Sequence, residues 1–303
     1  MQMTESWHGI FTILFTPFHD DRSLDEESLR REVDFVIEAG AHGIVAPVNS
    51  SEFYLLSDEE RRHYAEVLVD QAKARVPVVI GTAAPTVGTA EALTRHTRDL
   101  GAAGVIAMPP YVVRLDLDDI RDYYARIATA AGGLPVVLQN VGGEVGMPLG
   151  AEAIMRIAEA VPAVQYVKEE TLPSTHRISE LLRVSGGRLL GVFGGSLGRF
   201  LVDELKRGAC GLMSGCHLVD AQVRVYKLLR AGREDEARAA FLRQLPAHNL
   251  WSLLGMGVAK EILRRRGVFR TTVCRRPAPA LDSADQAELD HALALVHDDL
   301  VVK

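Results

Sequence analysis

One lysine of this chain lies in an apolar, strand-like segment, where burying its charge costs free energy. Lys168 lies in the apolar run at residues 164–168 and is followed by Glu169 and Glu170. A buried ammonium must be paired or neutral, and the neutral amine is the side chain that forms Schiff bases with carbonyl substrates. Only six of the 34 Lys and Arg residues are lysines, and the other five fall at the C-terminus or on the polar faces and ends of helical patterns. Lys168 is therefore either a reactive amine or a structural lysine paired with Glu169 or Glu170.

Short β-rich runs alternate with helical patterns through the first two thirds of the chain. Most of these runs are continuously apolar, as expected for parallel strands that are covered on both faces. Helix starts are marked by capping boxes at Ser23 with Glu26 and at Ser57 with Glu60. The predicted strands are residues 9–15, 43–48, 76–82, 104–108, 134–140, 164–168, 189–194 and 211–214.

Eight β-α repeats predict a (β/α)8 TIM barrel, an α/β fold that typically takes about 250 residues. A doubly wound sheet is the alternative, but the first strand is not followed by the glycine-rich fingerprint of that fold. After residue 218 only helical patterns follow, at 219–231, 233–245, 250–267 and 283–298. We therefore expect a barrel domain at residues 1–217 and a C-terminal helical extension at residues 218–303.

In such a barrel the active site lies at the C-terminal ends of the strands, where Lys168 is expected. Other predicted strands also end in polar or small residues, at Asn49-Ser50-Ser51-Glu52, at Gln139-Asn140 and at Gly194-Gly195-Ser196. The row 49–51 could hold a carboxylate or could be an ordinary turn. The two glycines could cradle a phosphate or leave room for a substrate, and Met213 in the last strand is a further candidate for substrate contact.

Composition argues against several classes of protein. A formal net charge of -6 argues against a nucleic-acid partner. No apolar run reaches the ~18 residues that cross a membrane. Three cysteines without close spacing fit a reducing compartment, and the N-terminus shows no secretory signal, so we expect a cytoplasmic location. The ten histidines form no metal-binding motif, and no Gly-x-Ser-x-Gly elbow is present, so neither a metal nor a serine triad is expected.

Several segments match the motifs of one known family: Thr16-Pro17-Phe18, Ser51-Glu52 followed by Asp58-Glu59-Glu60-Arg61, Met108-Pro109-Pro110-Tyr111, Tyr166-Val167-Lys168-Glu169 and Gly208-Ala209-Cys210-Gly211. In these segments the chain resembles the dihydrodipicolinate synthase and N-acetylneuraminate lyase superfamily of Schiff-base-forming lyases, essentially from end to end. The resemblance implies a TIM barrel that acts on a 2-oxo acid without a cofactor. It also implies that Lys168 is the Schiff-base lysine.

Three departures from the family pattern bear on the reaction. Gly-Thr-Thr-Gly-Glu is replaced by Val48-Asn49-Ser50-Ser51-Glu52, so that Ser50 keeps the second hydroxyl. Gln139 occupies the place of the tyrosine that shuttles protons, and a glutamine amide is neither an acid nor a base near neutral pH. Glu144 falls at or near the place of an entrance arginine that synthases use.

These departures favour a dehydratase of a 2-keto-3-deoxy sugar acid, a branch of the family that the glutamine resembles. Asn49, Ser50, Ser51 and Glu52 would bind substrate, with Ser50, Glu52 or an ordered water as the proton relay, and Gln139 would orient a hydroxyl. Tyr111, by resemblance, reaches a neighbouring subunit's site in a tetramer built from dimers, or else packs within its own loop. A pyruvate aldolase or synthase, and a non-catalytic 2-oxo-acid-binding protein, are the alternatives.

Overall fold

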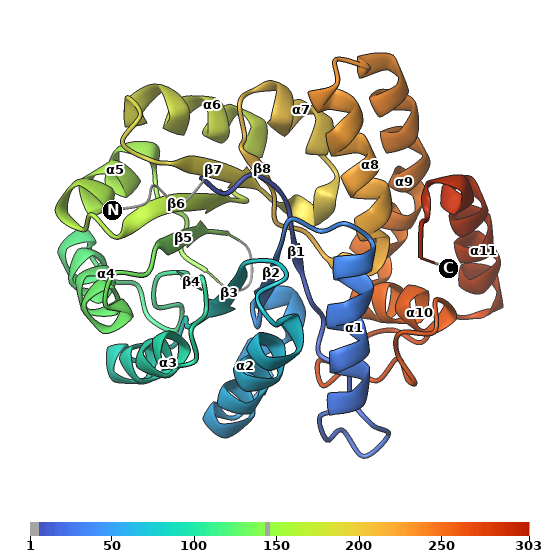
Figure 1. The fold of residues 1–303 in the computed structure, drawn as a ribbon, viewed down its shortest axis with the longest axis horizontal. Coiled ribbons are helices and arrows are strands. Elements are labelled where there is room, and N and C mark those ends of the chain that lie inside the picture. Colours follow the sequence, from blue (N-terminus) through green and yellow to red (C-terminus); the bar gives the residue numbers. More distant parts are fainter. Residues whose placement is uncertain (1–5, 143–145, 303) are drawn as a thin grey trace.

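The computed structural model describes residues 6–142 and 146–302. Eight parallel strands close into a barrel in chain order, and β1 pairs with both β2 and β8. The helices surround this barrel, as Figure 1 shows. The predicted α/β barrel with a C-terminal helical region is therefore confirmed. The strands are β1 (Gly9–Ile13), β2 (Gly43–Ala46), β3 (Val78–Gly81), β4 (Gly104–Ala107), β5 (Val136–Asn140), β6 (Val164–Glu169), β7 (Gly191–Gly194) and β8 (Gly211–Leu212).

Each strand up to β7 is followed by a helix that covers the outside of the barrel. These helices are α1 (Glu26–Glu38), α2 (Asp58–Ala72), α3 (Val87–Asp99), α4 (Leu117–Ala131), α5 (Ala151–Ala160), α6 (Ser174–Ser185) and α7 (Leu201–Lys206). The capping box of α2 is confirmed, because the Ser57 hydroxyl accepts from the Glu60 N–H and the Glu60 carboxylate accepts from the Ser57 N–H. The box predicted at Ser23 is wrong: the cap of α1 is Asp25, whose carboxylate accepts from the N–H of Ser28.

The interior of the barrel is filled by every second side chain of each strand, because successive side chains of a strand point to opposite faces. The cluster that fills it contains Phe11, Ile13, Val45, Val48, Val79, Ile106, Val137, Tyr166, Phe193 and Met213. Tyr166 of β6 points into this cluster, so Lys168, two residues further along the same strand, points to the same side. Lys168 therefore lies at the C-terminal end of β6, next to the packed interior of the barrel.

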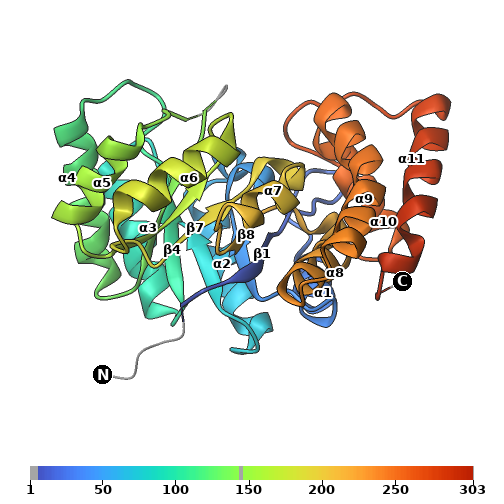
Figure 2. The ribbon, with the colours of Figure 1, turned by 90° about the horizontal axis from the view of Figure 1, so that it is seen from above.

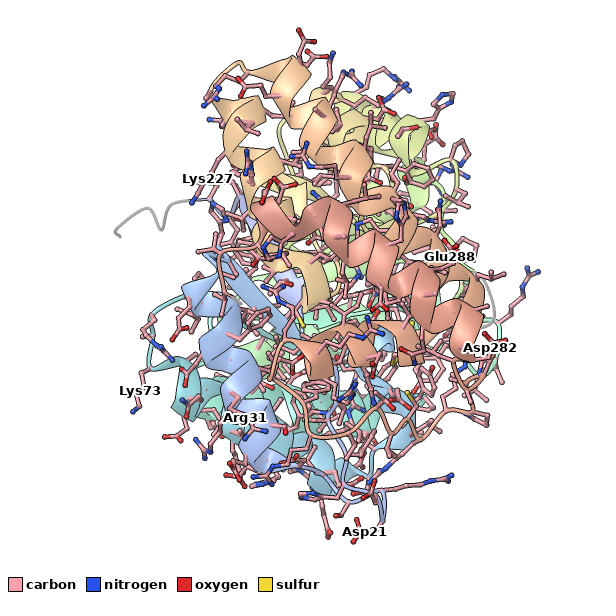
Figure 3. All side chains as sticks on the ribbon, turned by 90° about the vertical axis from the view of Figure 1, so that its right-hand side faces the viewer. Asp21, Arg31, Lys73, Lys227, Asp282 and Glu288 are labelled. Atoms are coloured by element: carbon pink, nitrogen blue, oxygen red, sulfur yellow. The ribbon has the colours of Figure 1, made fainter. Side chains whose placement is uncertain are left out.

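Helix α8 (Val219–Arg230) packs against β1 and completes the ring of helices around the barrel. The helices α9 (Glu234–Leu254), α10 (Met256–Arg265) and α11 (Ser283–Val296) form a layer beside the barrel, seen beyond α1 and α8 in Figure 2. Figure 3 faces α11, whose cap residue Asp282 and exposed Glu288 lie along its outer side. Among the described residues no helix is both long and apolar enough to cross a membrane.

Two expectations for this region are corrected by the structure. The helix predicted at 233–245 continues through Pro246 to Leu254, and the break falls at Gly255, which has a φ of 80°. A proline inside a helix removes one hydrogen bond, but Ala247 and Trp251, which follow the proline on the same helix, are buried and stabilise its continuation. Lys260 was predicted on a polar face or helix end, yet its side chain is fully buried, because it is paired.

Candidate active site

Lys168 is nearly fully buried, with 2% of its surface exposed. The register of the sheet places it beside Gln139 of β5 and beside Phe193 of β7. A buried amine at the C-terminal end of a barrel strand is in the position where (β/α)8 enzymes hold their reactive groups.

The partner of Lys168 is Glu170. The Nζ atom of Lys168 lies 2.8 Å from Oε2 of Glu170, whose side chain is only 16% exposed. Glu169 points elsewhere: its carboxylate accepts from Asn140 Nδ2 at 2.7 Å and from the Thr171 N–H at 2.6 Å. Burial raises the pKa of Glu169. The sequence left open which of the two glutamates pairs with the lysine, and the structure selects Glu170.

Two further hydrogen bonds fix the Glu170 carboxylate. Gln139 donates from Nε2 to the same Oε2 atom at 2.9 Å. The N–H of Ser196 donates to Oε1 at 3.3 Å. A Cβ atom at Gly195 would lie 2.5 Å from Oε1, so this position leaves room for the carboxylate rather than for a side chain. The carboxylate thus joins the lysine of β6, the glutamine of β5 and the turn after β7.

Asn49 and Ser50 form a short 3-10 turn after β2 with Ser51. Asn49 and Ser50 line a cleft of about 800 Å³. The Oδ1 atom of Asn49 is buried and has no hydrogen-bond partner among the described residues. Ser51 is buried, and its hydroxyl donates to the Leu14 carbonyl at 2.5 Å and accepts from the Val48 N–H at 3.1 Å. Asn49 and Ser50 are therefore available to a ligand, whereas the Ser51 side chain holds the turn in place.

Glu52 directly follows this turn in a left-handed conformation, with a φ of 55°. Its Oε1 atom lies 2.8 Å from Nζ of Lys260, and both side chains are fully buried. Its Oε2 atom accepts from the N–H of Arg276 at 2.7 Å. The Glu52 carboxylate thus links the turn to the C-terminal region, a role that the sequence did not indicate because these partners lie more than 200 positions away.

The remaining predicted site residues have varied surroundings. Tyr111 packs edge-on against Phe53, with ring centroids 5.7 Å apart, and burial raises the pKa of its phenol. A Cβ atom at Gly194 would lie 1.8 Å from Oε2 of the buried Glu204. Met213 lies in the core of the barrel. Glu144, at the place of the entrance arginine, lies outside the described residues.

Nothing in the described ranges, 6–142 and 146–302, gathers three or more His, Cys, Asp or Glu side chains into a potential metal site. His217 and His248 lie close together, with ring centroids 5.6 Å apart, but they are fully buried without acidic ligands. Burial lowers the pKa of His248 to about 4. Direct contacts thus join Lys168, Glu170 and Gln139, whereas Asn49 and Ser50 line the cleft, whose lining does not include those three residues.

A closed parallel barrel with a buried lysine at the C-terminal ends of its strands defines a (β/α)8-barrel protein that carries an amine at the end of the barrel where such proteins hold their active sites. The chain belongs to the dihydrodipicolinate synthetase family, which matches residues 6–295. Members of this family are lyases.

Named relatives are similar over most of the chain. An L-2-keto-3-deoxyarabonate dehydratase of Azospirillum brasilense is 33% identical over 99% of this chain and 97% of its own length. A 4-hydroxy-tetrahydrodipicolinate synthase of Pelobacter propionicus is 32% identical over 80% of this chain and 82% of its own. Relatives of both activities therefore resemble the chain at similar levels of identity.

Solved structures agree with the fold. The crystal structure of dihydrodipicolinate synthase from Rhodopseudomonas palustris has a TM-score of 0.88 and 30% identity, and covers 97% of this chain and 99% of that chain. A sialic acid aldolase of Ruminococcus gnavus, crystallised as a catalytic lysine mutant, has a TM-score of 0.90 but only 20% identity, over 99% of this chain and 98% of that chain. The second likeness concerns the fold alone.

Proposed function

We propose that this protein is a Schiff-base-forming dehydratase of a 2-keto-3-deoxy sugar acid. The observation that carries the proposal is the position of the Glu170 carboxylate, 2.8 Å from the Lys168 amine and bound on the same oxygen by Gln139. A carboxylate can transfer protons near neutral pH, whereas the glutamine that replaces the family's tyrosine cannot. The similarity to the Azospirillum brasilense dehydratase supports the same reaction class.

The reaction would begin when Lys168 passes a proton to Glu170 and attacks the C2 ketone. Loss of water, with a proton returned by Glu170, gives an iminium that withdraws electrons from C3. Glu170 then removes a C3 proton to form an enamine, and returns it to the C4 hydroxyl as that group leaves as water. A further water hydrolyses the resulting iminium, after tautomerisation, and frees Lys168. The net change is the loss of one water from the substrate.

The other residues would bind and orient the substrate. Asn49 and Ser50 would hold the C1 carboxylate, and Gln139 would hold Glu170 and orient the substrate hydroxyl. In this scheme Ser51 and Glu52 support the turn, because their side chains are engaged by the protein. Gly195 would leave space for the Glu170 carboxylate, while Tyr111 would complete the site of a neighbouring subunit.

The experiment that tests the proposal is borohydride trapping with pyruvate and with a 2-keto-3-deoxypentonate, read by intact and peptide mass spectrometry. We expect a stable adduct on Lys168 with both compounds, and semialdehyde product without release of pyruvate. Lys168→Ala should abolish the adduct. Lys206→Ala is the matched control, because Lys206 is exposed and paired only with Glu234 on the surface.

Each alternative gives a distinct result in this experiment. Release of pyruvate from the sugar acid, or consumption of pyruvate with an aldehyde, would identify a carbon–carbon lyase or synthase instead. Saturable binding without an adduct or turnover would identify a 2-oxo-acid-binding protein. Turnover by Lys168→Ala would reject the scheme altogether.

The proposal includes a cytoplasmic homotetramer built from dimers that needs no cofactor. Light scattering after size exclusion should give the mass of four 33.1 kDa chains. Activity should persist after extensive dialysis against a chelator.

A further inference from the structure

The cleft above the barrel is bounded by the C-terminal region as well as by barrel loops. On the barrel side it is lined by Asn49, Ser50, Val141 and Gly142. On the opposite side it is lined by two segments, residues 251–256 at the junction of α9 and α10 and residues 276–279 after α10. Any substrate that reaches the turn after β2 therefore also faces the C-terminal region.

Arg276 is the cation of this lining. The other described lining residues are apolar or neutral, among them Trp251, Leu254, Met256 and Pro277. A guanidinium presents several N–H donors in a planar fork, which suits hydroxyl and carboxylate oxygens. The cleft therefore pairs an uncharged polar turn, at Asn49 and Ser50, with a cationic side chain contributed by a distant part of the chain.

The position of Arg276 is set by the protein rather than by the substrate. Its backbone N–H donates to Oε2 of Glu52 at 2.7 Å, and the other oxygen of Glu52 is held by the buried Lys260. Lys260 also donates to the Val273 carbonyl at 2.8 Å, which fixes the segment that leads to Arg276. The side chain is directed by Tyr54, whose hydroxyl lies 3.3 Å from Nη1.

These contacts make the turn after β2 and the Arg276 segment one unit. Glu52 follows Asn49 and Ser50 directly, and its carboxylate is bonded to the backbone of Arg276. Because the backbone of this segment is already held in place, less entropy is lost when Arg276 binds a ligand, so the contact contributes more to affinity.

We propose that Arg276 is a specificity-determining residue that binds the distal oxygen group of the substrate, at the end remote from the C1 carboxylate. The distal group is a terminal hydroxyl or a terminal carboxylate of a 2-keto-3-deoxy sugar acid. Glu52 and Lys260 are positioning residues for this contact. The inference rests on the proposed function for the identity of the substrate, but not on turnover.

Pyruvate separates this role from binding of the C1 carboxylate, because it has the carboxylate and the ketone but no distal group. We would measure the concentration dependence of borohydride trapping for pyruvate and for the sugar acid, in the wild type and in Arg276→Gln. We expect the sugar acid to bind about 10- to 100-fold more weakly, as for the loss of a hydrogen bond to a charged group, and pyruvate to bind within about twofold of wild type. Arg276→Lys should recover part of the loss.

Two further comparisons complete the test. Arg207→Gln, at an exposed arginine bonded to Ser179, controls for the loss of a surface cation. The fold should tolerate Arg276→Gln, since the backbone bond to Glu52 does not depend on the side chain, and thermal unfolding checks this. Two substrates that differ only in their distal group, a hydroxyl or a carboxylate, identify the group that Arg276 binds. The substrate that carries this group should lose more affinity in Arg276→Gln.

Equal losses for pyruvate and the sugar acid would overturn the inference, because Arg276 would then act on the common end or on the fold. Unchanged affinities for both compounds in Arg276→Gln would overturn it as well. Failure of the proposed function gives a different result: the wild type would form the sugar-acid adduct without producing the semialdehyde, or would bind both compounds without an adduct. The ratio of the two affinities, measured by trapping or by equilibrium binding, would still test Arg276.

Discussion

The Lys168 ammonium and the Glu170 carboxylate lie 2.8 Å apart at the C-terminal end of β6. Glu170 directly follows the strand and lies two residues after Lys168, so the alternation of side chains places the two groups on the same side. Gln139 of β5 and the Ser196 N–H after β7 then hold the carboxylate from both neighbouring strands. The relationship gives the amine a proton acceptor within direct reach.

Replacing Glu170 by glutamine should separate imine formation from elimination. The amide cannot transfer a proton, so we expect kcat to fall by about 10²- to 10⁴-fold, the usual contribution of a general acid–base group. The borohydride adduct on Lys168 should still form, though more slowly. Glu180→Gln, at an exposed glutamate near Arg177, should leave steady-state kinetics unchanged. Dehydration by Glu170→Gln at more than a third of the wild-type rate would remove Glu170 from the mechanism.

A methyl group at Gly195 should displace the Glu170 carboxylate. The added Cβ atom would lie 2.5 Å from Oε1, so the carboxylate must move away from Lys168. A displacement of about 1 Å at a reacting group can lower the rate by about 10²-fold, and we expect a loss of that order in kcat for Gly195→Ala. Gly150→Ala is the control, because no atom lies within 4 Å of its added Cβ atom. Equal kinetics of the two variants would contradict this prediction.

Replacing one member of the buried pair of Glu52 and Lys260 should lower the stability of the protein more than replacing both members. Lys260→Met leaves a buried carboxylate without its cation, so the free energy of unfolding should fall by about 3–5 kcal/mol. The double variant with Glu52→Gln should lose less than the sum of the single losses. Urea unfolding of the four proteins of this cycle measures the coupling. The exposed pair of Lys206 and Glu234 should show a coupling of about 0–1 kcal/mol, and a similar value for the buried pair would argue against its role.

Glu32 should make the protein less stable as the pH rises. Burial raises the pKa of its carboxyl group from 4.5 to about 8, and the Phe15 N–H donates to Oε1 at 2.9 Å. Between these pH values the folded state keeps a proton that the unfolded state has lost. The stabilisation is therefore complete below pH 4.5 and is lost as the pH rises towards 8, by an amount on the order of a few kcal/mol.

Glu32→Gln tests this dependence, because the amide oxygen can still accept from Phe15 and does not titrate. Chemical unfolding at a series of pH values should show a smaller decline in stability between pH 4.5 and 8 for the variant than for the wild type. Parallel curves for the two proteins would show that Glu32 does not titrate in this range.

The order and direction of the strands could be predicted from the sequence. Continuous apolar runs, such as the one that became β4, are typical of parallel strands covered on both faces, and eight β-α repeats leave few arrangements other than a closed barrel. The exceptional position of Lys168 was visible for the same reason, since a lysine in an apolar strand is costly wherever the strand lies.

The partners of buried charges could not be predicted in this way. Lys260 lies within a helical pattern of the sequence, which predicts a position on the polar face or at the end of the helix. Its partner Glu52 lies 208 positions earlier, so the pattern could not indicate that the lysine is buried and paired. Only closure of the barrel and packing of α10 against it bring the two together and offset the cost of burying each charge. Similarly, two adjacent glutamates follow Lys168, and only the neighbouring strands decide that Glu169 bonds to Asn140 while Glu170 faces the lysine.

The sequence by itself determined the elements of this protein, because periodicity and local capping act over a few residues. The tertiary structure decided which polar groups meet, because their distances depend on contacts between elements far apart in the chain. The position of Arg276 over the cleft, set through Glu52 and Lys260, is one such case.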